Sequence, residues 1–531
     1  MDKINDLENF SIVEVDPDKL DDEREEIDDR YQRRGSCIIL PIFSLPSNYG
    51  IGTVGKEAYK FIEFLAESEQ RYWQILPIGP TTYGDSPYQS YSSFAGNPYL
   101  IDLELLEEDG LLEKEEFENV HFSDDPSYVN YSLLYLYRLK VLKLAYNRAW
   151  SRYLKEIEEF RDKNAYWIED YALYMALKEY FLDISWTEWP EDIKLRKKEA
   201  LERYSAELKD EVNFFVFLQY IFFKQWDKLR DIAKKHHIDI IGDIPIYIAM
   251  DSADAWANSE ILLLDEKTKN PIEVGGSPPD GFTEDGQLWG NPVYDWEYLK
   301  NTEYEWWIKR IEINLRFYDI LRLDHFIGFS SFWSVPYGDE TAKYGKRRKG
   351  PGYELFKKLK EELGELPIII EDLGVLSDEV FELKKKVGYP GMAVLQFGFA
   401  PFANSDYIPH NIQENTIVYT GTHDNQTTRA WLEELDEKGF KFVKKYLNLS
   451  EEEGYNWGMI RAAMMTNARL AVIPMQDYLN LGDEARMNEP GTLGKNWRWR
   501  ADKSDFNQKL MERIKYITKL YGRANGRPNR Y

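Results

Sequence analysis

Three acidic residues, Asp324, Glu371 and Asp424, each follow an apolar run that is typical of a buried β-strand. They lie in the segments Arg322-Leu323-Asp324-His325, Glu371-Asp372-Leu373-Gly374 and Thr422-His423-Asp424-Asn425. When parallel strands form a barrel, side chains at their C-terminal ends point into one shared mouth. Two or three carboxylates that converge in this way are the groups that break a glycosidic bond. The pattern therefore indicates carbohydrate chemistry.

The neighbours of these three residues predict a different catalytic role for each. A retaining mechanism needs one carboxylate as nucleophile and a second group that acts first as acid and then as base. Arg322 lies two residues before Asp324, and residues i and i+2 of a strand face the same side, so Arg322 can keep Asp324 ionised. Glu371 follows a very apolar run, and desolvation there would raise its pKa, as a general acid at neutral pH requires. Asp424, beside His423, can hold sugar hydroxyls and stabilise an oxocarbenium-like transition state.

A single carboxylate after a strand more often caps a helix or forms a salt bridge, but three of them weaken that interpretation. The chain has eight apolar, β-rich runs, at residues 37–42, 72–78, 238–246, 317–323, 367–370, 392–397, 416–419 and 470–474. Most are followed by segments with apolar residues at helical spacing, such as 54–67, 306–315, 380–387 and 505–520. Strands that alternate with helices in this way predict an α/β fold, a (β/α)8 TIM barrel.

The long interval between the second and third runs predicts an insertion. About 160 residues separate them, too many for a loop. We interpret residues 103–208 as a helical subdomain inserted after strand 2, followed by a helix over 212–235. Residues 249–300 are predicted to form a smaller insertion near the active-site mouth. The catalytic barrel is expected to span 35–531, after an acidic N-terminal extension at 1–34.

Composition excludes several other classes of protein. The net charge of −26 argues against nucleic acid and anionic membranes as partners. The single cysteine, Cys37, cannot form an internal disulfide. No Cys/His cluster has metal-ligand spacing, no acidic loop suits calcium, and neither a Walker loop nor a Rossmann fingerprint is found, so we expect no metal and no cofactor. The polar N-terminus lacks an apolar signal-peptide core, which predicts a cytoplasmic protein.

The chain also resembles a known family over roughly residues 35–500. Several motifs carry the resemblance, and together they are highly specific. They are Ser44-Leu45-Pro46-Ser47, Gly50-Ile51-Gly52, Trp73-Gln74-Ile75-Leu76-Pro77, Gly84-Asp85-Ser86-Pro87-Tyr88-Gln89-Ser90, Ala95-Gly96-Asn97-Pro98, Gly242-Asp243-Ile244-Pro245, Asp251-Ser252-Ala253-Asp254, Gly286-Gln287-Leu288-Trp289-Gly290-Asn291-Pro292, Pro474-Met475-Gln476-Asp477 and Arg486-Met487-Asn488-Glu489-Pro490-Gly491. In these motifs the chain looks like glycoside hydrolase family 77, the 4-α-glucanotransferases or amylomaltases.

The resemblance implies roles for particular residues. Asp324 matches the family nucleophile, Glu371 the acid/base and Asp424 the transition-state stabiliser. The residues that match sugar-site positions, or partners of the catalytic residues, are Ser86, Tyr88, Asp243, Arg322 and His423. From the residues themselves we add further expected sugar contacts, which are Phe282, Gln287, Trp289, His325 and Asn488. Aromatic rings suit the apolar faces of sugars. For the aromatic residues the alternative is packing in the core, for Asn488 it is an Asx turn, and for His325 it is orientation of the loop through a backbone hydrogen bond.

The chain departs from the family pattern in one loop. The segment Gly275–Phe282 resembles the lid that covers the acceptor side, and Gly281 stands where the family often has Tyr or another side chain. Glycine offers no stacking surface and adds backbone freedom. The glycine therefore bears on the strength of acceptor binding and on any tendency to make large cyclic glucans.

The predicted function is transfer of an α-1,4-glucan segment to the 4-hydroxyl of an acceptor. The expected partners are malto-oligosaccharides, starch or glycogen, with glucose as an acceptor. Two alternatives remain on the sequence alone. One is an α-amylase-type hydrolase on the same barrel, and the other is a glucan-binding protein with an inactive site. The presence of all three carboxylates and Arg322 disfavours the second alternative.

Overall fold

Eight short parallel strands form the central sheet of the molecule. The computed structural model describes residues 34–525, except for residues 83, 280–283, 375 and 400–404. The strand order is β10-β11-β12-β1-β2-β3-β6-β9, and each neighbouring pair is parallel. The strands are β1 Gly35–Ile39, β2 Tyr72–Gln74, β3 Asp239–Ile244, β6 Ile320–Leu323, β9 Ile368–Ile370, β10 Gly391–Val394, β11 Thr416–Tyr419 and β12 Leu470–Pro474. The sheet forms a nearly closed barrel, which confirms the predicted (β/α)8 fold.

The eight predicted runs are the eight strands, although their limits differ. Almost every strand residue is buried, because strands covered on both faces are apolar throughout. The run 392–397 was predicted too long, since Leu395–Gly398 form the short helix α15. Likewise Phe317 belongs to helix α11, Glu305–Phe317, and not to the fourth strand. A short apolar run cannot separate a strand from a buried helical turn by its periodicity.

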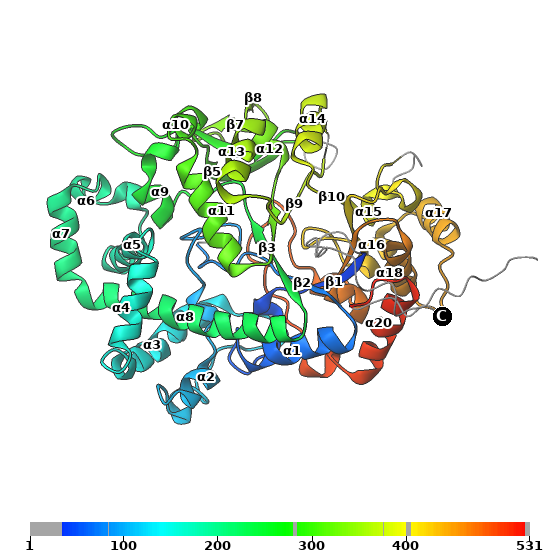
Figure 1. Cartoon of the computed structure of the whole chain (residues 1–531), viewed down its shortest axis with the longest axis horizontal. Coiled ribbons are helices and arrows are strands. Elements are labelled where there is room, and N and C mark those ends of the chain that lie inside the picture. The colour runs from blue at the N-terminus through cyan, green and yellow to red at the C-terminus, as the bar shows by residue number, and fades with distance from the viewer. Residues whose placement is uncertain (1–33, 83, 280–283, 375, 400–404, 526–531) are drawn as a thin grey trace, which may run out of the picture. The chain divides into compact units, whose positions relative to one another are not determined.

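Helices pack around the barrel and connect its strands (Figure 1). The helices predicted from apolar spacing correspond to α1 Lys56–Glu67, α8 Lys209–Lys235, α11, α14 Asp378–Val387 and α20 Gln508–Leu520. The apolar face of α8 lies in the core, where Phe222, Trp226 and Leu229 are all fully buried. The other helices that follow β3 are α9 Ala253–Ala257, α10 Trp296–Asn301, α12 Ile327–Ser330, α13 Tyr353–Leu363, α16 Thr428–Glu434, α17 Glu437–Leu447, α18 Tyr455–Met465 and α19 Met475–Leu479.

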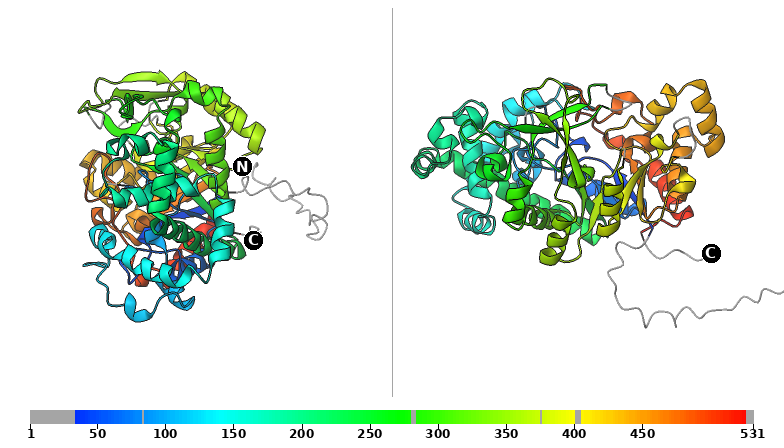
Figure 2. Two further views of the ribbon diagram at one scale, coloured as in Figure 1. Left: turned by 90° about the vertical axis from the view of Figure 1, so that its left-hand side faces the viewer. Right: turned by 90° about the horizontal axis from the view of Figure 1, so that it is seen from above.

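The chain between β2 and β3 is mostly helical. It contains α2 Leu103–Glu108, α3 Tyr131–Ala149, α4 Leu154–Lys163, α5 Ile168–Tyr180, α6 Glu191–Lys194 and α7 Lys198–Glu207, followed by α8. In two views, α4 to α7 gather at one end of the molecule (Figures 1 and 2). The limits of an insertion subdomain at residues 103–208 stay a prediction. Across the described residues, no helix is both long and apolar enough to cross a membrane.

A second, four-stranded antiparallel sheet was not predicted. Its order is β5-β4-β7-β8, from β4 Glu273–Ser277, β5 Gln287–Pro292, β7 Ser331–Pro336 and β8 Lys346–Lys349. The strands β4 and β5 follow β3, whereas β7 and β8 follow β6. A small core of Val274, Val335 and Ala342 holds the sheet together, with Trp333 packed against it. The sheet thus joins two loops that leave neighbouring barrel strands at the same rim.

Candidate active site

The strand register brings the predicted acidic residues to one rim. On neighbouring strands β3 and β6, Asp243 pairs with Arg322. On β6 and β9, Leu323 pairs with Ile370, and the next residues along the two strands are Asp324 and Glu371. Backbone bonds continue past the strand ends, because the Glu371 N–H donates to the Leu323 carbonyl over 2.9 Å. The carboxyl ends of β3, β6 and β9 therefore present these side chains together.

Arg322 connects two of the carboxylates. Its Nη1 donates to both oxygens of Asp243, over 2.8 and 2.7 Å, and to Oδ1 of Asp324 over 2.9 Å. The side chain is almost fully buried. Burial alone would lower the pKa of Arg322, but Asp243 and Asp324 raise it well above its ordinary value. The two side chains face the same side, as the i, i+2 spacing predicted, and because a buried charge requires partners of this kind, the guanidinium fixes the position of Asp324.

Tyr88 links Asp243 to His423. Its hydroxyl donates to Asp243 Oδ2 over 2.8 Å, and its ring stacks on the imidazole of His423 with 5.1 Å between centroids. Burial and the nearby Asp243 raise the pKa of the Tyr88 hydroxyl well above its ordinary value, so the group stays protonated and can donate. Burial also raises the pKa of Asp243, and Arg322 opposes that effect. Tyr88 comes from the long segment after β2, which explains why its partners lie far away in the sequence.

Glu371 accepts hydrogen bonds from two backbone donors. The N–H of His325 donates to Oε2 over 2.8 Å, and the N–H of Leu373 donates to Oε1 over 2.7 Å. Burial, followed by the negative charge of Asp324, raises the pKa of Glu371 to about 7, although Arg322 and the two N–H groups lower it. The direction agrees with the desolvation that the apolar run before Glu371 predicted. Near neutral pH this carboxyl can therefore exist in both protonation states.

Asp424 has different partners. His423 Nε2 lies 3.3 Å from Asp424 Oδ2, and Asn488 Nδ2 donates to Oδ1 over 2.6 Å. Partial desolvation in the mouth would raise the pKa of Asp424, but His423 and Asn488 outweigh it and lower the pKa to about 2. In turn, burial would lower the pKa of His423, and the charge of Asp424 raises it. Asn488, which was predicted to contact sugar, uses its amide for Asp424 in this structure.

The small sheet contributes an aromatic wall beside Asp324. Trp289 on β5 meets the His325 imidazole edge to face, with 4.8 Å between centroids, and its Nε1 donates to Gln287 Oε1 over 3.2 Å. His325 has a left-handed φ of 51°, which lets the backbone turn sharply directly after Asp324. Trp289 and Gln287 are both partly exposed. Phe282 and Gly281 lie outside the described residues.

Two further residues shape the site in ways that the sequence did not reveal. Trp497 is buried and packs against both Tyr88 and His423, with centroid distances of 5.8 and 5.9 Å. Arg486 donates to the backbone carbonyl of Asp424 over 3.3 Å. Ser86 accepts a hydrogen bond from the N–H of Tyr88 over 3.3 Å, so it stabilises the loop that carries Tyr88. The only sequence signal for Arg486 was its place in the same motif as Asn488.

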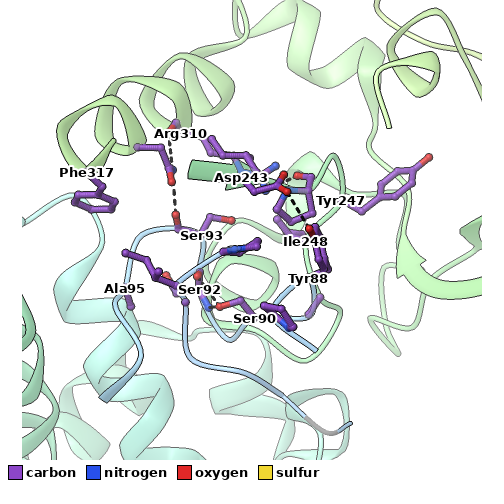
Figure 3. Close-up of a pocket in the computed structure, with 18 of the residues that line it drawn as sticks. Tyr88, Ser90, Ser92, Ser93, Ala95, Asp243, Tyr247, Ile248, Arg310 and Phe317 are labelled. Atoms are coloured by element: carbon purple, nitrogen blue, oxygen red, sulfur yellow. Dashed lines mark hydrogen bonds between the residues drawn. The ribbon is translucent and has the colours of Figure 1, made fainter. Parts of the chain in front are cut away.

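A small cavity of about 40 Å³ lies behind Asp243 and Tyr88 (Figure 3). Ser90, Ser92 and Ser93 line it on one side, and Arg310 of α11 contributes on another. This volume suits a few water molecules and is far too small for a glucose ring. A sugar would therefore have to bind in the open mouth of the barrel, on the side of Asp243 where Arg322 and Asp324 lie. Among the residues that the structure describes, no group of His, Cys, Asp or Glu side chains is arranged to hold a metal ion.

The fold and the site together define a class of protein, the (β/α)8-barrel enzymes that act on glycosidic bonds with carboxylates at the carboxyl ends of their strands. Comparison with known proteins narrows the class. The model of the family described as 4-alpha-glucanotransferase, glycoside hydrolase family 77, matches residues 40–505, and this chain belongs to that family.

Individual relatives agree over nearly the whole chain. A 4-alpha-glucanotransferase from Clostridium butyricum is 51% identical over 486 residues, which cover 91% of this chain and 100% of that protein. A 4-alpha-glucanotransferase from Streptococcus pneumoniae is 46% identical over 497 residues, which cover 93% and 98% of the two chains. The solved structure of the amylomaltase from Streptococcus agalactiae, in complex with acarbose, has a TM-score of 0.91 at 40% identity and covers 93% of this chain and 100% of that chain.

Proposed function

We propose that this protein is a 4-α-glucanotransferase that moves segments of α-1,4-glucan from a donor to the 4-hydroxyl of an acceptor glucan or glucose. The reaction is a double displacement with net retention of configuration. The observation that carries the proposal is the pairing at the barrel mouth of a carboxylate held by Arg322 with a carboxyl whose pKa is about 7. Membership of the family supports the same conclusion.

In the first step Asp324 attacks the anomeric carbon of the donor. The glycosidic C–O bond breaks as the Asp324 oxygen forms its bond to carbon, and the neutral Glu371 gives its proton to the departing oxygen. The ion pair with Arg322 holds Asp324 in the orientation that this attack needs. The product is a glucosyl-enzyme ester and a shortened glucan with a new 4-hydroxyl.

In the second step Glu371 is ionised and acts as the base. It takes the proton of an acceptor 4-hydroxyl, the acceptor oxygen attacks the same anomeric carbon, and the bond to Asp324 breaks. Two inversions at one carbon give retention. A pKa near 7 serves both halves of this cycle, because the group must give a proton and then recover one.

Asp424 and its partners are proposed to stabilise the positive charge that develops on the sugar between the two steps. Its pKa of about 2 keeps it ionised through the working range, so its negative charge is always present. His423 contacts one of its two oxygens and Asn488 the other. Tyr88 and Asp243 complete the wall on which the donor glucose would rest.

Transfer exceeds hydrolysis only where a bound acceptor excludes water. Trp289 and Gln287 are proposed to contact the acceptor, because they lie on the rim next to His325, whose N–H holds Glu371. Phe282, Ser86 and the loop at 275–285 stay predicted parts of the binding surface. Starch or glycogen as natural donors, and a cytoplasmic location, are likewise proposals from the sequence.

Incubation with maltotriose tests the proposed function. Chromatography of the products should give a ladder of longer and shorter oligosaccharides, together with glucose, measured separately. A hydrolase would instead accumulate glucose and maltose without longer products. A binding protein with an inactive site would retain maltotriose and release nothing. The Asp324→Asn variant supplies the background for each measurement.

A further inference from the structure

The loop that carries His423 and Asp424 has buried ends and an accessible tip. It spans residues 420–428, from the end of β11 to the first residue of α16. Thr420 and Thr428, at its two ends, are completely buried, whereas the Asp424 side chain is 45% exposed. The position of the tip in the mouth therefore depends on how the two ends are held in the core.

One buried carboxylate holds both ends. Asp477 follows β12 in the helix α19 and is 1% exposed. Its Oδ2 accepts hydrogen bonds from the hydroxyls of Thr420 and Thr428, over 2.6 and 2.7 Å, and its Oδ1 accepts from the backbone N–H of Thr428 over 2.7 Å. The three donors come from the first and the last residue of the loop. Asp477 thus closes the loop at its base.

Asp477 is unusual because it is an acidic side chain in an almost fully buried position. Within the described part of the chain, no Lys, Arg or His forms an ion pair with it. Burial raises its pKa, while the donors from Thr420 and Thr428 lower it. A buried carboxyl that lacks a cationic partner is costly unless donors satisfy it, and these short bonds are the compensation. An apolar residue would fill the space without the cost but would leave the loop ends unconnected.

The tip of the loop 420–428 is held by residues that follow Asp477 in the chain. After α19, Asn488 donates its backbone N–H to the His423 carbonyl over 3.0 Å, and Arg486 donates to the Asp424 carbonyl. The segment 475–488 therefore contacts the loop at its base through Asp477 and at its tip through Asn488 and Arg486. Two points of attachment restrict both translation and rotation of the loop relative to the barrel.

We propose that Asp477 is a positioning residue for glucan transfer, which sets the placement of His423 and Asp424 over the reacting glucose by tying together the two ends of their loop. This inference rests on the proposed function. A displacement of about 1 Å in such a group can cost on the order of 100-fold in rate, so a loosened loop should act mainly on kcat. The Asp477→Asn variant should lower kcat by about 10- to 100-fold, with KM changed by about twofold or less.

Asp102 provides a matched control. It is also buried, it also accepts from a threonine hydroxyl and from a backbone N–H, namely Thr53 over 2.6 Å and Leu105 over 2.9 Å, and it caps α2 in the helical region after β2. The Asp102→Asn variant removes the same charge from a comparable setting that touches no residue of the proposed site. It should lower the melting temperature without changing kcat of the folded protein.

Amide hydrogen exchange distinguishes a local loosening of the loop from a general destabilisation of the protein. Asp477→Asn should speed exchange in residues 421–427 selectively, whereas Asp102→Asn should leave that segment unchanged. The Thr420→Val variant removes one of the three donors and should lower kcat in the same direction by a smaller factor. Asp477→Asn and Thr420→Val both disturb the hydrogen bond between these two residues. The fall in kcat of the double variant should therefore be smaller than the product of the two single falls.

The outcomes are distinct. If wild-type protein fails to disproportionate maltotriose, the proposed function is wrong. If wild type is active and Asp477→Asn, with its folded fraction measured, has the wild-type kcat, the positioning role is wrong while the function stands. Equal effects of Asp477→Asn and Asp102→Asn on melting temperature, exchange and kcat would also overturn the inference, because they would describe general destabilisation.

Discussion

The segments after β9 and β11 each present a carboxyl group to the same mouth, but the pKa of one is raised and the pKa of the other is lowered. Glu371 after β9 is held by two backbone N–H groups and lies close to the charge of Asp324, and its pKa is raised to about 7. Asp424 after β11 is held by an imidazole and an amide, and its pKa falls to about 2. The partners, more than the residue type, decide which carboxyl can carry a proton.

This difference assigns the chemistry. A group that gives and recovers a proton needs a pKa near the working pH, whereas a group that stabilises positive charge must stay ionised. Desolvation acts on both residues, so it does not separate them. The separation comes from Asp324, which lies beside Glu371, and from His423, which lies beside Asp424.

Replacement of Asp324 by Asn should have the largest effect. The variant lacks the nucleophile, so disproportionation of maltotriose should fall to background while the far-ultraviolet circular dichroism stays that of the wild type. The same change removes the negative charge beside Glu371 and should move the pKa of Glu371 down, which narrows the contrast with Asp424. Wild-type turnover by this variant would show that another residue is the nucleophile.

Replacement of Glu371 by Gln should cost on the order of 10²- to 10⁴-fold in kcat with natural glucans, because the departing sugar then receives no proton. A donor whose leaving group is fluoride needs no such proton. The first step with that donor should therefore be nearly as fast as in the wild type, as measured by the initial burst of fluoride. Equal losses with both donors would contradict the assignment of Glu371 as the acid.

The pH dependence of kcat/KM should reflect Glu371 on its alkaline side. The free enzyme must hold the proton of Glu371 for the first step, so kcat/KM should fall about tenfold per pH unit above a pKa of about 7. Asp424 ionises near pH 2 and should contribute no change between pH 5 and 9. Rates measured in that range with maltotriose, compared with Glu371→Gln, test the point, since the variant should lack the alkaline fall.

The two carboxyls should also change stability in opposite directions. The folded pKa of Glu371 exceeds its ordinary value of 4.5, so its contribution is present below pH 4.5 and lost as pH rises through about 7. Above pH 7, Glu371→Gln should therefore be more stable than wild type, by about 3 kcal/mol. The folded pKa of Asp424 is lowered, so its contribution is present above pH 4 and lost as pH falls to about 2.

For Asp424→Asn at pH 7 we expect a loss of about 1 kcal/mol or less, because the side chain is 45% exposed and solvent screens its partners. Urea unfolding at pH 4.5 and pH 8 measures both variants. A destabilised Glu371→Gln at pH 8 would show that the carboxylate is favoured in the folded protein, and the contrast between the two segments would then be lost.

Much of the barrel could be predicted because its strands are buried on both faces and form continuous apolar runs. The small sheet could not be predicted in that way. Its strand β8 consists of Lys346, Arg347, Arg348 and Lys349, all exposed, and its strand β4 contains two glycines, so neither has the alternation that marks a half-buried strand. Pairing with β7 and β5, brought together by the barrel, makes these segments strands.

The candidate site likewise contains residues that could be predicted from the sequence and residues that could not. Asp324 and Glu371 could be selected because each directly follows a strand, and Asp424 because it lies in the loop after β11; the end of a strand is recognisable in the sequence. Arg486, Asp477 and Trp497 could not be selected, because their importance comes from contacts with residues that lie far along the chain. Asn488 was selected for sugar, and the structure gives its amide to Asp424.

The amino-acid sequence by itself determined the eight strands, the acidic groups at their ends and the apolar surroundings of Glu371, because hydrophobic burial and strand direction are local properties. Only the tertiary structure decided which charges became neighbours. The distance between two ionisable groups sets their mutual energy, and groups separated by many residues, such as Tyr88 and Asp243 or Asp424 and Asn488, acquire that distance only when the barrel closes.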